Sequence, residues 1–142
     1  MDNDMKRSII LDHYSNARNR SVPDNVNDYI KINSNNQSCI DNIDIYVKIN
    51  DNKLIEDIKF QGEACVIAIS STSILSDMLI GKTIDEAKVI LKNYFNMIEE
   101  NEYDKDILGE ANVYEDMYKQ PSRKTCATLF ARGIGNYLKD KK

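Results

Sequence analysis

Alternating hydrophobic and polar positions predict the strands of this chain. Over residues 38–50 every second residue becomes apolar, which is typical of a strand with one buried face. The apolar positions are Ile43, Ile45, Val47 and Ile49. After a polar turn, residues 54–61 predict a second strand antiparallel to the first, and a third short strand could follow near 62–68.

Apolar positions at helical spacing replace this alternation from Val66 onward. They predict a helix that ends before Gly81, a residue type favoured just after a helix C-terminus. Residues 83–86 have the capping-box pattern and predict a second helix that runs to about Glu99. Pro121 in a first turn predicts a last helix that runs to about Lys139.

The remaining segments are more polar. Residues 5–16 predict an N-terminal helix capped by Asp4, residues 17–37 predict a long loop, and the acidic stretch 101–119 predicts a loop with a short helix. Because the strands come early and the helices late, we expect an α+β fold in a single domain over 1–142. Its expected core is a small antiparallel three-stranded sheet with helices packed on one face.

Composition narrows the functional classes. The 142 residues include 19 Lys and Arg and 23 Asp and Glu, giving a net charge of −4 and a pI near 5.0. This balance argues against a nucleic-acid partner, which normally requires a basic surface. No apolar run approaches the ~18 residues of a membrane span, and the N-terminus lacks the order of a secretory signal. We therefore expect a cytoplasmic protein with no membrane partner.

Three cysteines, Cys39, Cys65 and Cys126, are the main candidates for chemistry. An odd number in a chain expected in the cytoplasm argues against a disulfide framework. The three could be inert buried side chains, because free cysteine is among the most buried residue types. They could also form a site, because all three fall at the ends of predicted elements, where functional residues concentrate.

Asp41 makes the second interpretation more specific. It lies two residues after Cys39 and would share one side of an extended segment with it. The resulting set matches the number and type of ligands that tetrahedral zinc accepts. The set is Cys39, Asp41, Cys65 and Cys126. Arg123 and Lys124 could offset its negative charge, and a nearby helix N-terminus would lower the pKa of Cys126.

Other polar groups favour structural roles. His13, the only histidine, lies in the first predicted helix, where a structural or docking role is favoured over metal binding. The run Ser70–Ser73 has no histidine nearby, which favours helix packing over a nucleophile cluster. The acids of 101–119 lack the ligand order of a calcium loop, and a solvated face or partner surface is the better interpretation.

Four ordered segments resemble the U-type iron–sulfur cluster assembly proteins, the family of IscU, SufU and NifU N-terminal domains. The segments are LDHYSNARN (11–19), NQSCID (36–41), IEDIKFQGEAC (55–65) and RKTCATL (123–129). They are similar to the family patterns DHYxNPRN, NPxCGD, IxDxxFxGxGC and RxKCATL. The stretch 101–119 also resembles an insertion of the SufU branch.

The resemblance implies a SufE/NifU-like fold and a function in iron–sulfur cluster assembly, as a carrier or scaffold without classical small-molecule turnover. For the SufU branch it implies zinc at the four ligands above. Cys39 would accept persulfide sulfur from a PLP-dependent, SufS-like cysteine desulfurase, with Arg123 as a basic residue beside the site. For the IscU branch it implies that Cys39, Cys65 and Cys126 hold a nascent [2Fe–2S] or [4Fe–4S] cluster, which passes to downstream carriers or apoproteins.

The chain departs from the family pattern at several positions. Gln37 and Ile40 stand where the family has Pro and Gly, and Ala64 replaces a Gly. Thr125 stands where IscU has a metal-binding histidine. The missing histidine and the insertion favour the sulfur acceptor over the scaffold. A purely structural zinc site is a third alternative.

Overall fold

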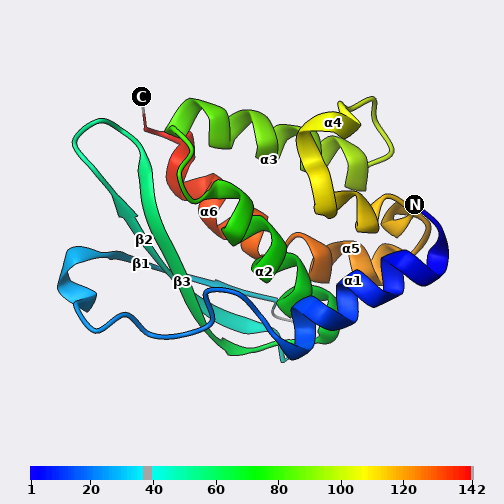
Figure 1. Ribbon diagram of the computed structural model, residues 1–142, viewed down its shortest axis with the longest axis horizontal. Helices are drawn as coiled ribbons and strands as arrows, with labels where there is room; N and C mark the ends of the chain where they lie inside the picture. Colours follow the sequence, from blue (N-terminus) through cyan, green and yellow to red (C-terminus); the bar gives the residue numbers. More distant parts are fainter. Residues whose placement is uncertain (37–39, 142) are drawn as a thin grey trace.

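The computed structural model describes residues 1–36 and 40–141, and Figure 1 shows the sheet on one side and the helices gathered on the other. The three antiparallel strands are β1 (Ile30–Asn35), β2 (Asn42–Ile49) and β3 (Ile55–Glu63), in that order across the sheet. This arrangement confirms the α+β class, the hairpin of β2 and β3, and the three-stranded sheet.

The prediction of a long loop over 17–37 is wrong for its last part, which forms strand β1. It pairs antiparallel with β2, from Ile30 opposite Val47 to Asn35 opposite Asn42. It is an edge strand whose residues are mostly polar and exposed. Its sequence therefore shows little of the apolar–polar alternation that predicts a strand. The third strand considered near 62–68 is also wrong, since Gly62 and Glu63 complete β3.

Gly62 allows β2 and β3 to approach closely beside the cysteine at position 65. Its φ is +142°, a conformation that favours glycine. A Cβ atom there would lie 2.3 Å from the carbonyl oxygen of Asn42 on the neighbouring strand. Any larger residue would therefore have to push the two strands apart.

The longer helices are α1 (Asn3–Ser15), α2 (Val66–Leu79), α3 (Ile84–Ile98), α5 (Pro121–Ala127) and α6 (Leu129–Lys139). Helices α2 and α3 follow the predicted bounds, and α3 begins with the predicted capping box of Thr83 and Glu86. Two details differ. Asp2, not Asp4, caps α1 by accepting from the Met5 N–H, and Thr128 divides the predicted last helix into α5 and α6.

The core lies between the inner face of β2 and β3 and the helices α2, α3 and α6. Its largest fully buried side chains include Ile45, Ile58, Phe60, Leu75, Tyr94 and Phe130. Gly133 allows α6 to lie close to the sheet. A Cβ atom at this position would be only 2.9 Å from the Ser34 Cβ. The Ser34 hydroxyl donates to the backbone oxygen of Leu129, which places the start of α6 against the end of β1.

The acidic stretch 101–119 forms α4 (Lys105–Leu108) and two 3₁₀ turns, Gly109–Tyr114 and Met117–Lys119. Its acids stay on the surface, but Leu108, Ala111 and Tyr114 are fully buried in the core. The stretch is therefore an integral part of the fold rather than only a solvated face. Within the described residues, no helix combines the length and apolar character needed to span a membrane.

Candidate metal centre

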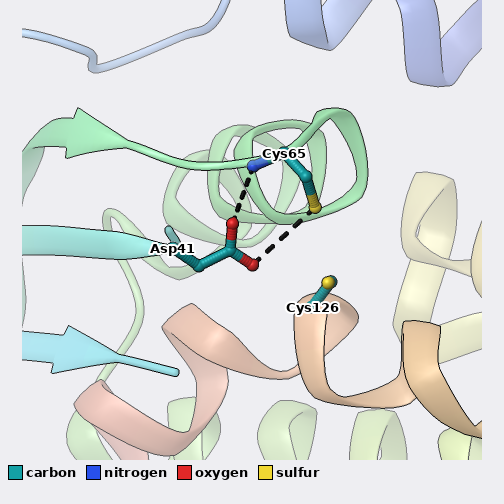
Figure 2. Close-up of side chains that lie close together, drawn as sticks. All are labelled: Asp41, Cys65 and Cys126. Carbon is teal, nitrogen blue, oxygen red and sulfur yellow. Dashed lines mark hydrogen bonds between the residues drawn. The ribbon is translucent and has the colours of Figure 1, made fainter. Parts of the chain in front are cut away.

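Three of the four predicted ligands come together where β2, α2 and α5 meet (Figure 2). Asp41 immediately precedes β2, Cys65 is the N-cap of α2, and Cys126 lies in the last turn of α5. One carboxylate oxygen and the two sulfur atoms all lie within 4.8 Å of one another. Cys39, the fourth predicted ligand, lies outside the described residues.

Asp41 is almost fully buried and joins the start of β2 to the start of α2. Its Oδ1 accepts a hydrogen bond of 2.9 Å from the backbone N–H of Cys65. Its Oδ2 lies 3.8 Å from the Cys65 Sγ and accepts from the side-chain amide of Asn36 at 3.2 Å. The carboxylate is thus held between a helix N-terminus and a thiol.

Cys65, rather than Cys126 as predicted, lies at a helix N-terminus. Its Sγ accepts from the backbone N–H of Ala68 at 3.5 Å, one of the N–H groups that a helix start leaves without an internal partner. The positive end of the α2 dipole therefore faces the cluster through Cys65.

Cys126 lies at the opposite end of its helix, so the expected lowering of its pKa is wrong. Burial, followed by the neighbouring Cys65 and Asp41, raises the pKa of the Cys126 thiol. A cation beside Cys126 would reverse that effect. Two thiols and a carboxylate are a donor set that suits zinc, so these residues fit such a metal.

Behind the ligands lies a hydrogen-bond network that sequence reasoning missed. The Asn36 side chain, which is buried, donates to Asp41 and accepts from Arg132 on α6. Arg132 also donates to the backbone oxygen of Thr125 and to the hydroxyl of Thr128. Asn36 begins a segment that resembles a family motif, which was an available signal, but nothing in the sequence pointed to Arg132.

Arg123 and Lys124, the two basic residues predicted beside the site, have different surroundings. Arg123 is exposed and lines a cleft of about 520 Å³ between α1, α2 and α5, together with Val66 and Ile67, which follow Cys65 directly. Lys124 instead forms an ion pair with Glu99 at 3.1 Å, so its direct partner is that carboxylate rather than the cluster.

His13 and the serine run have structural roles. The two ring nitrogens of buried His13 lie 2.8 Å from the Ser73 hydroxyl and 3.1 Å from a Glu110 carboxylate oxygen. The side chains of Ser70–Ser73 are fully buried in α2, and the hydroxyl of Ser71 donates to a backbone carbonyl of its own helix. The interpretation as helix packing agrees with these contacts.

The fold is a small α+β domain that gathers two thiols and a carboxylate at element ends, a group that could hold a metal ion. Residues 5–127 match the family model of the NifU-like N-terminal domain, and the chain belongs to that family. This is the family that the four sequence segments had indicated.

Several relatives and solved structures are similar to this chain. The zinc-dependent sulfurtransferase SufU of Bacillus subtilis is 39% identical over 124 residues, which cover 87% of this chain and 82% of that protein. The iron–sulfur cluster assembly scaffold protein IscU of Streptococcus pyogenes is 36% identical over 60% of this chain and 54% of its own.

Two solved structures are similar to this chain over most of its length. One is from Fervidobacterium islandicum and is described as an iron–sulfur cluster assembly scaffold protein for the SUF system. It superposes with a TM-score of 0.84 at 29% identity and covers 92% of this chain and 93% of that one. A structure described only as a hypothetical protein gives a TM-score of 0.86 at 30% identity, over 96% of this chain and 98% of its own.

Proposed function

We propose that this chain is a zinc-bound sulfur acceptor in iron–sulfur cluster assembly, acting as a single domain over 1–142. The observation that carries the proposal is the meeting of Asp41, Cys65 and Cys126 within 4.8 Å. It is supported by the 39% identity to a protein named as a zinc-dependent sulfurtransferase. The IscU relatives support the same pathway.

Asp41, Cys65 and Cys126 would hold the zinc, with Cys39 as the proposed fourth ligand. When bound, zinc would supply the positive charge that keeps the cysteines ionised at neutral pH. The hydrogen bond from the Cys65 N–H keeps the Asp41 carboxylate turned toward the sulfurs. Asp41 is the harder ligand of the set and binds a borderline metal more weakly than a thiolate does.

The sulfur transfer itself is a thiol exchange at Cys39. Its thiolate attacks the outer sulfur of a persulfide on the desulfurase cysteine. A new sulfur–sulfur bond forms on Cys39, the old one breaks, and the desulfurase cysteine leaves as a thiolate. Arg123, on the exposed side of α5, would place a positive charge beside the negatively charged sulfur groups during this exchange.

The partners that this function requires are a PLP-dependent, SufS-like cysteine desulfurase and downstream carriers or apoproteins that receive the sulfur or cluster. We propose a cytoplasmic location, because the thiols of Cys65 and Cys126 are free and a reducing compartment would keep them so.

The alternative function is a scaffold on which an iron–sulfur cluster forms on Cys39, Cys65 and Cys126. The Fervidobacterium structure and the IscU relatives, which are described as scaffolds, favour it. The donor set at this site weighs against it. Thr125 occupies the position of the IscU histidine, and His13 is engaged elsewhere by Ser73 and Glu110.

One purified preparation tests both functions. Metal content is measured by elemental analysis, and cysteine turnover by a SufS-like desulfurase is measured with and without the protein. We expect about one zinc per chain and a stimulation of turnover that Cys39→Ala abolishes. Asp41→Ala should lower the zinc content, and Val89→Ala, which changes an exposed side chain on α3, is the control.

The outcomes separate the alternatives. Zinc without stimulation would contradict sulfur transfer and leave a structural zinc site. No zinc, but a brown chromophore that needs iron and sulfide under anaerobic conditions, would favour the scaffold.

A further inference from the structure

We propose that Arg132 is a positioning residue that, acting through Asn36, holds Asp41 in the orientation needed to bind metal. The inference rests on the metal site of the proposed function and deepens it. Neither residue was among the predicted ligands, and neither side chain belongs to the cluster of Asp41, Cys65 and Cys126.

Asn36 contacts the carboxylate of Asp41 directly. Its side-chain Nδ2 donates to Asp41 Oδ2 at 3.2 Å, and its backbone N–H donates to the Asp41 carbonyl at 3.0 Å. The Oδ2 atom is the one that faces the Cys65 thiol. Rotation of the carboxylate away from the sulfurs would therefore break the side-chain contact with Asn36.

Arg132 determines which way the Asn36 amide points. Its Nη2 donates to Asn36 Oδ1 at 2.5 Å, so the oxygen of the amide faces α6 and the nitrogen is left to face Asp41. An amide turned the other way would present its oxygen to the carboxylate and its nitrogen to the guanidinium, and both contacts would be repulsive. The guanidinium charge also strengthens this hydrogen bond.

The same guanidinium is bonded to the segment that carries Cys126. Arg132 Nη2 donates to the backbone oxygen of Thr125 at 2.9 Å, and Nε donates to the Thr128 hydroxyl at 3.1 Å. Thr125 precedes Cys126 directly, and Thr128 is the residue at which α5 gives way to α6. One side chain thus connects the helix break beside Cys126 to the end of β1 and, through Asn36, to Asp41.

Residues that orient metal ligands in this way typically change metal affinity by about 10- to 100-fold when they are replaced. We expect Arg132→Met, which keeps much of the aliphatic chain and removes the guanidinium, to weaken zinc binding by about 10-fold. Arg132→Lys keeps a charge but not the forked donors, so its affinity should fall between those of Arg132→Met and the wild type.

The test is zinc competition with the chromophoric chelator 4-(2-pyridylazo)resorcinol. It compares wild type, Arg132→Met, Arg132→Lys, Asn36→Ala and the double variant of Asn36→Ala with Arg132→Met. Because Arg132 acts on Asp41 through Asn36, the double variant should lose less affinity than the sum of the losses in the two single variants. The absorption spectrum of the cobalt-substituted proteins reports the ligand geometry and should change in the same variants.

Lys124→Met is the matched control, because Lys124 is a neighbouring cation that pairs with Glu99 instead of the site. It should keep the wild-type zinc affinity. The thermal midpoint of each metal-free protein shows whether a variant is folded, and Asn36→Ala tests the same contact if Arg132→Met does not fold.

Wild-type affinity in Arg132→Met would overturn the inference, and so would full additivity in the double variant. A wild-type protein that binds zinc but does not stimulate the desulfurase would overturn the proposed sulfur transfer and leave this inference intact. A wild-type protein that takes up no zinc would overturn both.

Discussion

Helices α1 and α3 are of similar length but are attached to the molecule in opposite ways. Helix α3 buries seven residues of a continuous apolar face, from Ile84 to Ile98. Helix α1 buries only His13, with Ile9 and Ile10 in partial contact with the core. Its closest attachments are polar, between Lys6 and Asp116 and between His13 and the pair Ser73 and Glu110.

This difference separates two kinds of stability. The contribution of α3 is hydrophobic burial, which depends little on salt or pH. The contribution of α1 includes hydrogen bonds and ion pairs, which water and salt can replace. We therefore expect that α1 can be loosened with less disturbance of the core than α3. Because α1 also lines the cleft that contains Arg123, this loosening would occur beside the metal centre.

The largest effect is expected in α3. Leu91 is 4% exposed in the core. Leu91→Ala should lower the free energy of unfolding by about 2–5 kcal/mol through lost burial and a new cavity. Urea unfolding of the metal-free protein measures this change. The control is Val89→Ala, because Val89 is 49% exposed on the same helix and its replacement should change stability by less than about 0.5 kcal/mol. Equal effects of the two would contradict the burial argument.

An intermediate and local effect is expected in α1. His13→Ala removes both ring contacts and should cost about 1–3 kcal/mol, because the buried Ser73 hydroxyl loses a partner. Hydrogen exchange should accelerate in the amides of α1 and stay unchanged in α3. Tyr14→Ala, at a neighbouring exposed position, should leave both helices as in the wild type. Faster exchange throughout the molecule would show that α1 and the core unfold together.

The same contrast explains which elements the sequence predicted well. The apolar spacing and the Thr83 capping box of α3 are local signals, and the helix begins at that capping box and ends within a residue of the predicted bound. Strand β1 has no such signal. Its edge position leaves most of its residues exposed, and its pairing with β2 joins residues that are distant in the sequence. The break at Thr128 was missed because Pro121 and the later apolar positions suit one continuous helix.

The metal centre shows a similar limit. Cysteine, aspartate and a family-like spacing led to Asp41, Cys65 and Cys126, which the fold brings together. Residue types do not show which helix end each ligand occupies, so the sequence predicts a helix N-terminus at Cys126, whereas the fold places one at Cys65. Arg132 could not be found from sequence because its role depends on β1 ending beside α6, and that strand was not predicted.

A smaller effect is expected for the ion pair of α1. Lys6 Nζ lies 2.9 Å from an Asp116 carboxylate oxygen and 3.7 Å from one of Glu115. Lys6→Met should cost roughly 0.2–1 kcal/mol, and the cost should shrink in 1 M salt, where charges are screened over about 3 Å. Unfolding at low and high salt measures it. Lys105→Met, at a more exposed lysine 3.8 Å from Glu115, should have a smaller effect.

The smallest effect is the pH dependence of this same pair. The hydrogen bond with Lys6 lowers the pKa of Asp116 below its ordinary value of 3.8, and the bond with Asp116 raises the pKa of Lys6 above 10.5. The contribution of Asp116 is therefore complete above its ordinary pKa and is lost as the pH falls through its lowered folded-state pKa. The contribution of Lys6 is complete below 10.5 and is lost as the pH rises through its raised folded-state pKa.

The stability difference between wild type and Lys6→Met should thus be constant between about pH 5 and 9 and should decline in acid below the ordinary Asp pKa. Urea unfolding over a pH series measures that difference. When the same comparison is made in proteins that carry Asp116→Asn, most of the decline in acid should disappear. A difference that stays constant down to pH 2 would mean that Lys6 holds α1 through the packing of its chain rather than its charge. Helix α1 would then be attached in the same way as α3, with less area.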